Sequence, residues 1–155
     1  MSSDSPLRGV RILDFSRLLP GPYATSILAS LGAEVVKVEE PLLSDAMRHF
    51  PPLLNGTGVT FQHQNRGKQS VALDLKQEAG QDIAQRLAAR SDVVVEGFRP
   101  GVAERLGIEF RQLSTCNPRL IYCSISGFGQ GGEFRDLLGH DLTYAAMSGL
   151  RWPRW

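Results

Sequence analysis

Short apolar runs alternate with amphipathic segments along the chain, and the first run predicts a strand over Val10–Phe15. The valines at positions 35, 36 and 38 predict a second buried strand. Between the two strands, apolar positions recur with the 3.6-residue period of a helix, at Tyr23, Ala24, Ile27, Leu28 and Leu31. Pro22 suits the first helical position, and Gly32 lies just past the last turn. Residues 10–39 therefore predict a strand, a turn, a helix and a second strand.

The same alternation continues beyond residue 70. Further strands are predicted over Ser70–Leu75, Asp92–Phe98 and Leu120–Ser126. Helices are predicted over Gln77–Arg90, after Pro100-Gly101, over about Phe110–Thr115, and over His140–Leu150. In the helix over 77–90, the apolar face consists of Ala79, Ile83, Ala84, Leu87 and Ala88. Strands that alternate with helices predict an α/β fold, a Rossmann-like open, mostly parallel sheet with helices on both faces.

The stretch from Pro41 to Gly67 is rich in Pro, Asn, Gln and Gly, and we predict it to be irregular. A long structureless segment in a compact domain often covers a ligand or meets a partner. We treat residues 1–155 as one domain, because 155 residues suffice for a single core.

Ligands of open parallel sheets bind outside the carboxyl ends of the strands. The segments that leave those ends are residues 18–22, 73–76, 97–99 and 127–132. The first is Leu18-Leu19-Pro20-Gly21-Pro22, which has one glycine and two prolines without an N–H to donate. Such a turn is unsuited to a pyrophosphate, which needs several backbone N–H groups at a helix start. It offers an apolar shelf that suits an adenine ring or a pantetheine arm.

A glycine-rich segment, Gly127-Phe-Gly-Gln-Gly-Gly132, matches the Gly-x-Gly-x-x-Gly pattern of dinucleotide sites after a strand. The residues that follow it, Glu133-Phe134-Arg135, begin no convincing helix. A plain connecting loop is one alternative, and a loop that borders a ligand site is another. The hypothesis that the protein is a nicotinamide-dependent oxidoreductase is therefore supported by this loop alone.

Composition removes several classes of partner. The formal net charge is +1, with 42% hydrophobic and 21% charged residues, so nothing favours nucleic acid or an anionic membrane as partner. No apolar run approaches the roughly 20 residues that span a bilayer, and the first residues lack the features of a signal peptide. Cys116 and Cys123 match no metal or redox spacing, and neither do His49 and His63, so we predict no metal site. We expect a cytoplasmic protein with both cysteines reduced and Cys123 packed in a strand as a small hydrophobe.

Several ordered blocks resemble class III CoA-transferases, a family that includes formyl-CoA transferase, carnitine CoA-transferase and 2-methylacyl-CoA racemase. The resemblance begins with Leu-Asp-Phe-Ser-Arg-x-x-x-Gly-Pro and Leu-Gly-Ala-Glu-Val-Val-Lys-Val-Glu, within residues 13–39. It continues through residues 65–76, 95–101, 117–130 and 139–144, and covers about residues 7–150. It implies acyl-CoA and carboxylic acids as substrates, with no permanently bound cofactor. The resemblance also implies that the loop at 127–132 borders the acyl-CoA site.

The resemblance also implies which residues contact CoA. Lys76 and Arg105 match positions that bind CoA, and cations are the partners that phosphates need. The turn Gly97-Phe98-Arg99 brings backbone and an aromatic ring to the nucleotide or pantetheine. The predicted contacts are Leu18, Leu19, Pro20, Leu73, Leu75, Lys76, Gly97, Phe98, Arg99, Arg105, Gly139, Asp141 and Tyr144. One position departs from the family, since Glu40 stands where an arginine often helps to bind CoA.

His140 is the candidate catalytic residue. It lies in Gly139-His140-Asp141, at or near a helix start, and histidine titrates near neutrality. In the racemase branch the matching histidine is one of two groups that exchange the α-proton of an acyl-CoA thioester. The alternative is a structural histidine that caps the helix or forms a hydrogen bond. Asp141 suits an N-cap or a group that orients the histidine.

The aspartate that the resemblance assigns as nucleophile, or as second acid/base group, lies in a Gly-Asp segment well after the Gly-His-Asp block. These 155 residues stop at Trp155 before such a segment, and the tail Leu150–Trp155 is unlike the family continuation. We therefore expect a truncated chain with little turnover, and not the interlocked homodimer of full-length members. The leading hypothesis is the CoA-binding part of a CoA-transferase. A racemase fragment and a non-catalytic acyl-CoA-binding module are the alternatives.

Overall fold

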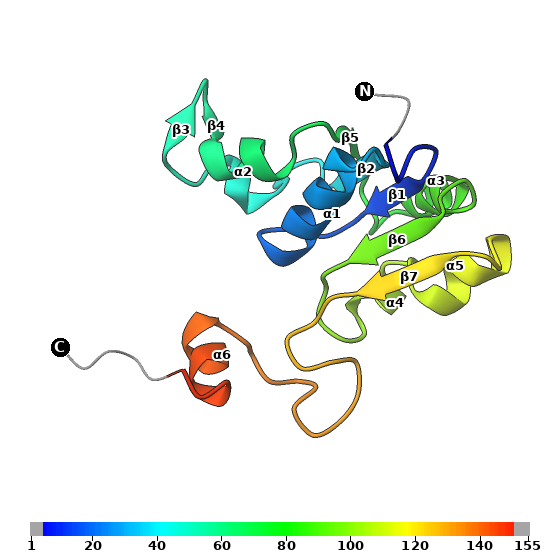
Figure 1. The fold of residues 1–155 in the computed structure, drawn as a ribbon. Helices are drawn as coiled ribbons and strands as arrows, with labels where there is room; N and C mark the ends of the chain where they lie inside the picture. The colour runs from blue at the N-terminus through cyan, green and yellow to red at the C-terminus, as the bar shows by residue number, and fades with distance from the viewer. Residues whose placement is uncertain (1–4, 151–155) are drawn as a thin grey trace.

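A computed structural model describes residues 5–150, in which five parallel strands form one sheet (Figure 1). The strands are β1 (Arg11–Asp14), β2 (Glu34–Glu39), β5 (Gln69–Ala72), β6 (Val93–Glu96) and β7 (Ile121–Ser124). Their order across the sheet is β5-β2-β1-β6-β7, so the direction of winding changes between β1 and β6. This is the doubly wound arrangement, and the predicted α/β class is confirmed.

Helices cover both faces of the sheet. Helix α1 (Pro20–Ser30) packs on the face that contains Ile12, Val35 and Val95. Helices α3 (Glu78–Ala88) and α5 (Phe110–Cys116) cover the other face, where the larger core contains Leu13, Phe15, Val38, Ala84, Ala88, Val94, Ile108 and Leu113. Neighbouring strand residues such as Ile12 and Leu13 enter opposite cores, because side chains alternate along a strand.

The buried face of α1 differs from the prediction. Tyr23, Ile27 and Leu31 are 53%, 44% and 41% exposed, and Ala24 is exposed as well. The residues that turn inward are Gly21, Pro22 and Thr25, with Leu28 half-buried. The helix also begins at Pro20, two residues before the predicted start. Its orientation is set by Thr25, whose hydroxyl donates to the buried carboxylate of Asp14 in β1.

Helix α3 is rotated in a similar way from the predicted face. Ala84 and Ala88 are fully buried as expected, but Ala79 is exposed and Ile83 is 41% exposed. Gly80 is the buried residue of the first turn, and a Cβ there would lie 2.1 Å from the Asp74 carbonyl oxygen. The close approach of helix and chain at Gly80 therefore turns Ala79 and Ile83 outward.

The stretch over 41–67 is more ordered than predicted. It contains a 3₁₀ turn (Ala46–Arg48), a hairpin of β3 (Leu53–Leu54) and β4 (Thr57–Gly58), and helix α2 (Val59–Gln64). The hairpin turns at Asn55-Gly56, where both residues have positive φ angles of 51° and 77°. Asn-Gly is the preferred pair for a two-residue turn of this kind, so the sequence did contain the signal.

Cys123 lies in edge strand β7 but is exposed, which corrects the prediction that it packs in the core. Tyr122 packs against the core under α3 and α5, so Ile121 and Cys123 face the opposite side by alternation. Helix α1 contacts β1 and β2 on that side, and Ile121 remains 63% exposed. Both cysteines are free thiols.

Helix α4 (Val102–Arg105) follows Pro100-Gly101 as predicted. A loop without helix or strand then runs from β7 to α6 (Asp141–Met147), so no helix follows the glycine-rich segment directly. His140 is the N-cap of α6 and Asp141 its first residue, which reverses the capping role predicted for Asp141. Figure 1 shows α6 set apart from the sheet at the end of this loop. Residues 151–155 of the tail lie outside the described residues.

Candidate functional site

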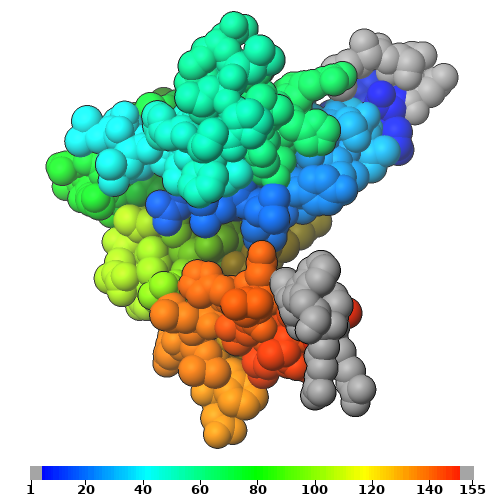
Figure 2. Space-filling model, turned by 90° about the vertical axis from the view of Figure 1, so that its left-hand side faces the viewer, coloured from blue at the N-terminus to red at the C-terminus, as the bar shows by residue number. Residues whose placement is uncertain are grey.

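The winding direction changes between β1 and β6, and two cavities open beside the carboxyl ends of these strands. One, which we call the His140 cavity, has a volume of about 650 Å³ and is lined by Pro20, Gly97, Phe98, Arg99, Pro100, Val102, Arg105, residues 125–127, residues 135–140 and Tyr144. The other, the Lys76 cavity, has about 510 Å³ and is lined by Phe15, Arg17, Val38, Glu39, Glu40, Leu43, residues 73–76, Phe98, Val102, Arg105 and Leu106. Figure 2 shows the segment after residue 130, in orange, below the body of the molecule beside the lime-coloured residues near 105.

The two cavities share a wall of three side chains, Phe98, Val102 and Arg105. Phe98 follows β6, while Val102 and Arg105 belong to α4. The guanidinium of Arg17 lies 5.2 Å from the centre of the Phe98 ring, so the turn after β1 contacts the turn after β6. A ligand longer than either cavity can therefore lie along this wall and occupy both.

Carboxylates fix the backbone of the turns that reach these cavities. In each of three turns, a carboxylate accepts the N–H of the residue two positions later. The pairs are Asp14 with Ser16, Asp74 with Lys76, and Glu96 with Phe98, at 2.9, 3.0 and 2.7 Å. These bonds hold the backbone of the turns in place.

A buried ionic network lies beneath the turn after β1, on the face that α1 covers. Lys68 lies 3.2 Å from Asp14, and the Lys68 ammonium also donates to the Thr25 hydroxyl at 2.7 Å. Burial lowers the pKa of Lys68, and the charge of Asp14 offsets only part of this effect. Lys37 lies 3.0 Å from Asp45, and both side chains are 1% exposed.

Glu39 forms the third buried pair. It accepts two hydrogen bonds from the Arg48 guanidinium, at 2.7 and 2.6 Å, and one from the Ser70 hydroxyl at 2.7 Å. Burial alone would raise the pKa of Glu39, but the bonds from Arg48 and Ser70 and the charge of Arg48 lower it to about 2. The same bond raises the pKa of Arg48, whose guanidinium also lies 3.9 Å from the centre of the Phe61 ring.

The Lys76 cavity combines cations with apolar side chains. Lys76, Arg105 and Arg17 supply positive charge, and Leu73 and Leu75 supply a buried apolar floor. Three carboxylates, Glu39, Glu40 and Asp74, line the same cavity. Glu39 is paired with Arg48, whereas Glu40 is half-buried and accepts the N–H of Leu43. This mixture can bind a phosphorylated ligand that also has an apolar part.

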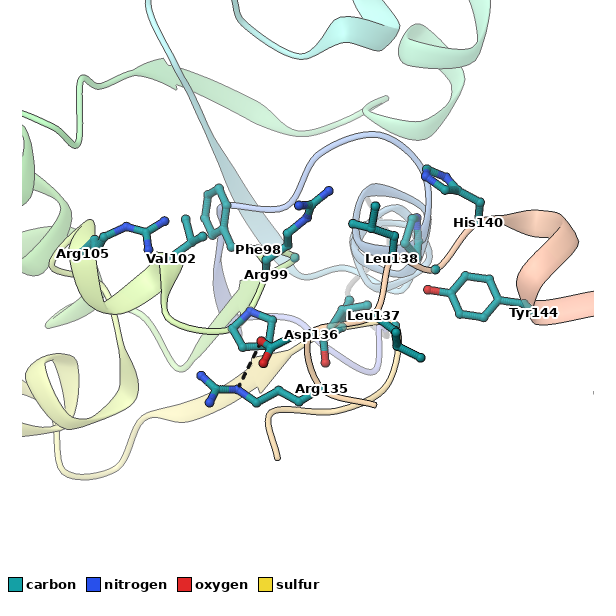
Figure 3. A pocket seen from close by; sticks show the side chains of 17 residues that line it. Phe98, Arg99, Val102, Arg105, Arg135, Asp136, Leu137, Leu138, His140 and Tyr144 are labelled. Atoms are coloured by element: carbon teal, nitrogen blue, oxygen red, sulfur yellow. Dashed lines mark ion pairs between the residues drawn. The ribbon is translucent and has the colours of Figure 1, made fainter. Parts of the chain in front are cut away.

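In the His140 cavity, His140 and Tyr144 lie on the side opposite Phe98 and Arg99, with Leu137 and Leu138 between them (Figure 3). His140 is exposed, and its side chain makes no capping bond to α6. The Tyr144 hydroxyl fits against two glycines, since a Cβ on Gly139 would lie 1.8 Å from it and one on Gly127 2.3 Å. The Tyr144 ring packs on Phe128 with centroids 5.6 Å apart.

Most of the predicted contact residues line these cavities. Leu73, Leu75, Lys76, Phe98 and Arg105 meet in the Lys76 cavity, and Pro20, Gly97, Arg99, Gly139, His140 and Tyr144 join Phe98 and Arg105 in the His140 cavity. Leu18 and Leu19 are 51% and 56% exposed and line neither of the two cavities, and Asp141 is likewise outside their linings. The roles of all these residues toward a ligand stay predictions.

Neither the place of Arg17 in the cavity nor the buried ionic network was predicted from the sequence. A signal for the network was present, because Asp14 and Lys37 interrupt runs of apolar residues that were predicted to be buried strands. A charged residue inside such a run is seldom buried unless it is paired. Within residues 5–150, no cluster of three or more His, Cys, Asp or Glu side chains is arranged to bind a metal. None of the helices in that range combines the length and apolarity that crossing a membrane requires.

Comparison with known proteins identifies the family. The model of "CoA-transferase family III" matches residues 7–152. The chain belongs to CoA-transferase family III. A "Succinyl-CoA:glutarate CoA-transferase" of Mus musculus is 44% identical over 149 residues, and an "Acetyl-CoA:oxalate CoA-transferase" of Acetobacter aceti is 41% identical over 145. An "Alpha-methylacyl-CoA racemase" of Mus musculus is 44% identical over 144 residues.

Solved structures agree with the fold. A CAIB/BAIF family protein from Brucella suis superposes with a TM-score of 0.88 at 37% identity, over 94% of this chain and 39% of that protein. A hypothetical protein from Mycobacterium tuberculosis also gives a TM-score of 0.88, at 41% identity, over 97% and 42%. The match covers 93–96% of this family III chain but only 34–37% of the three relatives named above, so the chain spans about a third of their length.

Proposed function

We propose that this chain forms the coenzyme A-binding part of a CoA-transferase, which moves CoA between an acyl-CoA and a carboxylic acid. The observation that carries the proposal is the pair of adjoining cavities with the shared wall of Phe98, Val102 and Arg105. One cavity is suited to the nucleotide and the other to the thioester. An acyl-CoA has the same division, with phosphates at one end and a reactive carbonyl at the other.

The nucleotide end belongs in the Lys76 cavity. Lys76, Arg105 and Arg17 provide charge-assisted donors for phosphate oxygens, and Leu73 and Leu75 provide an apolar surface for the base or the pantetheine. Glu40 adds a negative charge to the lining of this cavity. Its carboxylate repels a phosphate, so we expect weaker CoA binding than an arginine at this position would give.

The thioester end belongs in the His140 cavity. Phe98 and Pro20 offer apolar contacts to the pantetheine as it passes the shared wall. The Tyr144 hydroxyl, held against Gly127 and Gly139, is placed to donate to a carbonyl oxygen of the ligand. The imidazole of His140 is a candidate general acid or base for the thioester.

Calorimetric titration with CoA tests this proposal. Lys76→Ala and Arg105→Ala should each weaken binding by about 1–3 kcal/mol, because each removes a charged hydrogen-bond donor to phosphate. Arg119→Ala is the matched control, since Arg119 lies at the amino ends of the strands and lines neither cavity. Equal affinity of all three variants and the unaltered chain would refute the assignment of the phosphate site.

A second candidate is an acyl-CoA racemase, which His140 beside the thioester cavity and the 44% identity to the mouse racemase favour. Replacing the matched third of the mouse racemase, and of the mouse glutarate CoA-transferase, by this chain distinguishes the two. Transfer activity only in the second hybrid supports the leading proposal. Racemisation that His140→Ala abolishes supports the alternative.

We expect little turnover from the 155 residues alone, because they contain no Gly-Asp segment after the Gly-His-Asp block. CoA binding without transfer would then describe this chain, and a non-catalytic acyl-CoA-binding role gives the same result. CoA transfer by the hybrid transferase would distinguish the CoA-transferase part from a non-catalytic acyl-CoA-binding module, since a module adapted only to bind is not expected to support the transfer reaction. A cytoplasmic location stays a prediction.

A further inference from the structure

Leu18 has a backbone conformation that needs an explanation. Its φ angle is +66°, in the left-handed region that is unfavourable for a leucine because its Cβ crowds the backbone. The Leu18 side chain is 51% exposed, so burial of that side chain does not compensate for the cost. The surrounding structure must therefore impose this conformation on the turn from Ser16 to Pro20.

Two buried side chains hold this turn from below. The Lys37 ammonium donates to the Ser16 carbonyl oxygen at 2.8 Å. The Asp45 carboxylate accepts the Leu18 N–H through both oxygens, at 3.3 and 3.4 Å. Lys37 and Asp45 are 3.0 Å apart, so one ion pair binds a carbonyl and an N–H of the same turn.

The burial of this pair favours a positioning role. An ion pair that is 1% exposed at both ends contributes little to stability compared with apolar side chains of the same volume. It does supply directional bonds, which apolar residues lack. The turn that it holds contains Arg17, which lines the Lys76 cavity and lies over Phe98, and Pro20, which lines the His140 cavity.

We infer that Lys37 and Asp45 are positioning residues, which clamp the Ser16–Pro20 turn in the conformation that presents Arg17 and Pro20 to a CoA thioester. The inference rests on the proposed function for the identity of the ligand. Neither Lys37 nor Asp45 lines either cavity, so they act through the turn.

A double-mutant cycle between positions 45 and 18 tests the clamp. Asp45→Asn should weaken CoA binding about tenfold, because Leu18 then relaxes from its left-handed conformation. In the Leu18→Gly background the same substitution should change affinity by less than about threefold, since glycine adopts φ angles near +66° freely. Asp92→Asn is the control, because the Asp92 carboxylate also accepts a backbone N–H, that of Arg11 at 2.8 Å, but it does not bond the turn and lines neither cavity. Asp92→Asn should leave the affinity for CoA unchanged in both backgrounds.

Two results would overturn the inference. One is an equal loss of affinity on Asp45→Asn in both backgrounds, and the other is no loss in either. If Asp45→Asn does not fold, Lys37→Met combined with Asp45→Leu replaces the pair by apolar side chains of similar size. That double variant should keep the fold and lose affinity, with recovery by Leu18→Gly, and full affinity without Leu18→Gly would again overturn the inference.

A readout without ligand separates this inference from the proposed function. The Cα chemical shift and the amide–Hα coupling constant of Leu18, measured by nuclear magnetic resonance, report its φ angle. If CoA does not bind the unaltered chain, the proposed function fails, but the clamp is still tested. Left-handed values that are lost on Asp45→Asn support the clamp, and left-handed values that persist contradict it.

Discussion

Individual charged residues, rather than apolar ones, determine the geometry near the carboxyl ends of the strands. On the face under α1, the amino-terminal halves of β1 and β2 contribute the apolar residues Ile12 and Val35. The carboxyl-terminal halves contribute the charged residues Asp14 and Lys37. Each buried charge has a partner, because an unpaired charge in this position would be very costly. The turns above are therefore fixed by directional bonds before any ligand arrives.

The ionisation of Glu39 makes the free energy of unfolding depend on pH in the acid range. The pKa of Glu39 is about 2 in the folded chain, against an ordinary value of 4.5. The ionised carboxylate therefore stabilises the folded chain at pH values above 4.5, and this stabilisation is lost as the pH falls toward 2. As the pH falls from 5 to 3, protonation of Glu39 should lower the free energy of unfolding by about 2 kcal/mol. Urea denaturation followed by circular dichroism at both values of pH measures this loss.

The Glu39→Gln variant provides the comparison, because it cannot titrate. The difference in stability between the unaltered chain and Glu39→Gln should shrink by that amount as pH falls from 5 to 3. Arg48→Gln should shrink the pH dependence too, since the guanidinium that lowers the pKa is gone. A difference that stays constant with pH would show that the Glu39–Arg48 pair does not shift this pKa.

At the scale of elements, periodicity predicted where the helices lie better than how they face the core. In α1 the pattern selects the large apolar residues Tyr23, Ile27 and Leu31, yet Thr25 is the residue at 0% exposure. Hydrophobic periodicity cannot show this, because the orientation depends on Asp14 and Lys68, which are distant in sequence. The hairpin at Asn55-Gly56 was predictable from its turn residues alone, whereas the exposure of Cys123 follows from the place of β7 at the sheet edge.

The orientation of α1 can be tested at Thr25. Thr25→Val keeps the shape of the side chain but leaves Asp14 and Lys68 without the hydroxyl, so it should lower the free energy of unfolding by about 1–3 kcal/mol. Ser26→Ala is the matched control, because the Ser26 hydroxyl bonds only its own helix at the exposed Tyr23 carbonyl, and its effect should stay within about 0.5 kcal/mol. The midpoint of urea denaturation measures both. Equal effects would mean that Thr25 does not anchor the helix.

At the scale of the whole molecule, the alternation of strands and helices predicted the fold class, and most of the site residues that the family resemblance implies line the two cavities. The order of the strands could not be predicted from the hydrophobic pattern, because periodicity does not show which strands are neighbours. The order β5-β2-β1-β6-β7 is what brings the turns after β1 and β6 together, although 82 residues separate Asp14 from Glu96. A site made at a change in winding direction thus emerges only from the assembled sheet.

The assembled sheet also favours the proposed ligand, CoA, over a dinucleotide. The glycine-rich segment at 127–132 leads into a loop instead of a helix, so it lacks the helix N-terminus that binds a pyrophosphate. CoA at one hundred times its dissociation constant should stabilise the chain by about 2.7 kcal/mol, or roughly 5–11 °C in melting temperature. NAD at the same concentration should leave the melting temperature unchanged. Differential scanning fluorimetry measures both, and stabilisation by NAD but not by CoA would reverse the assignment of these cavities.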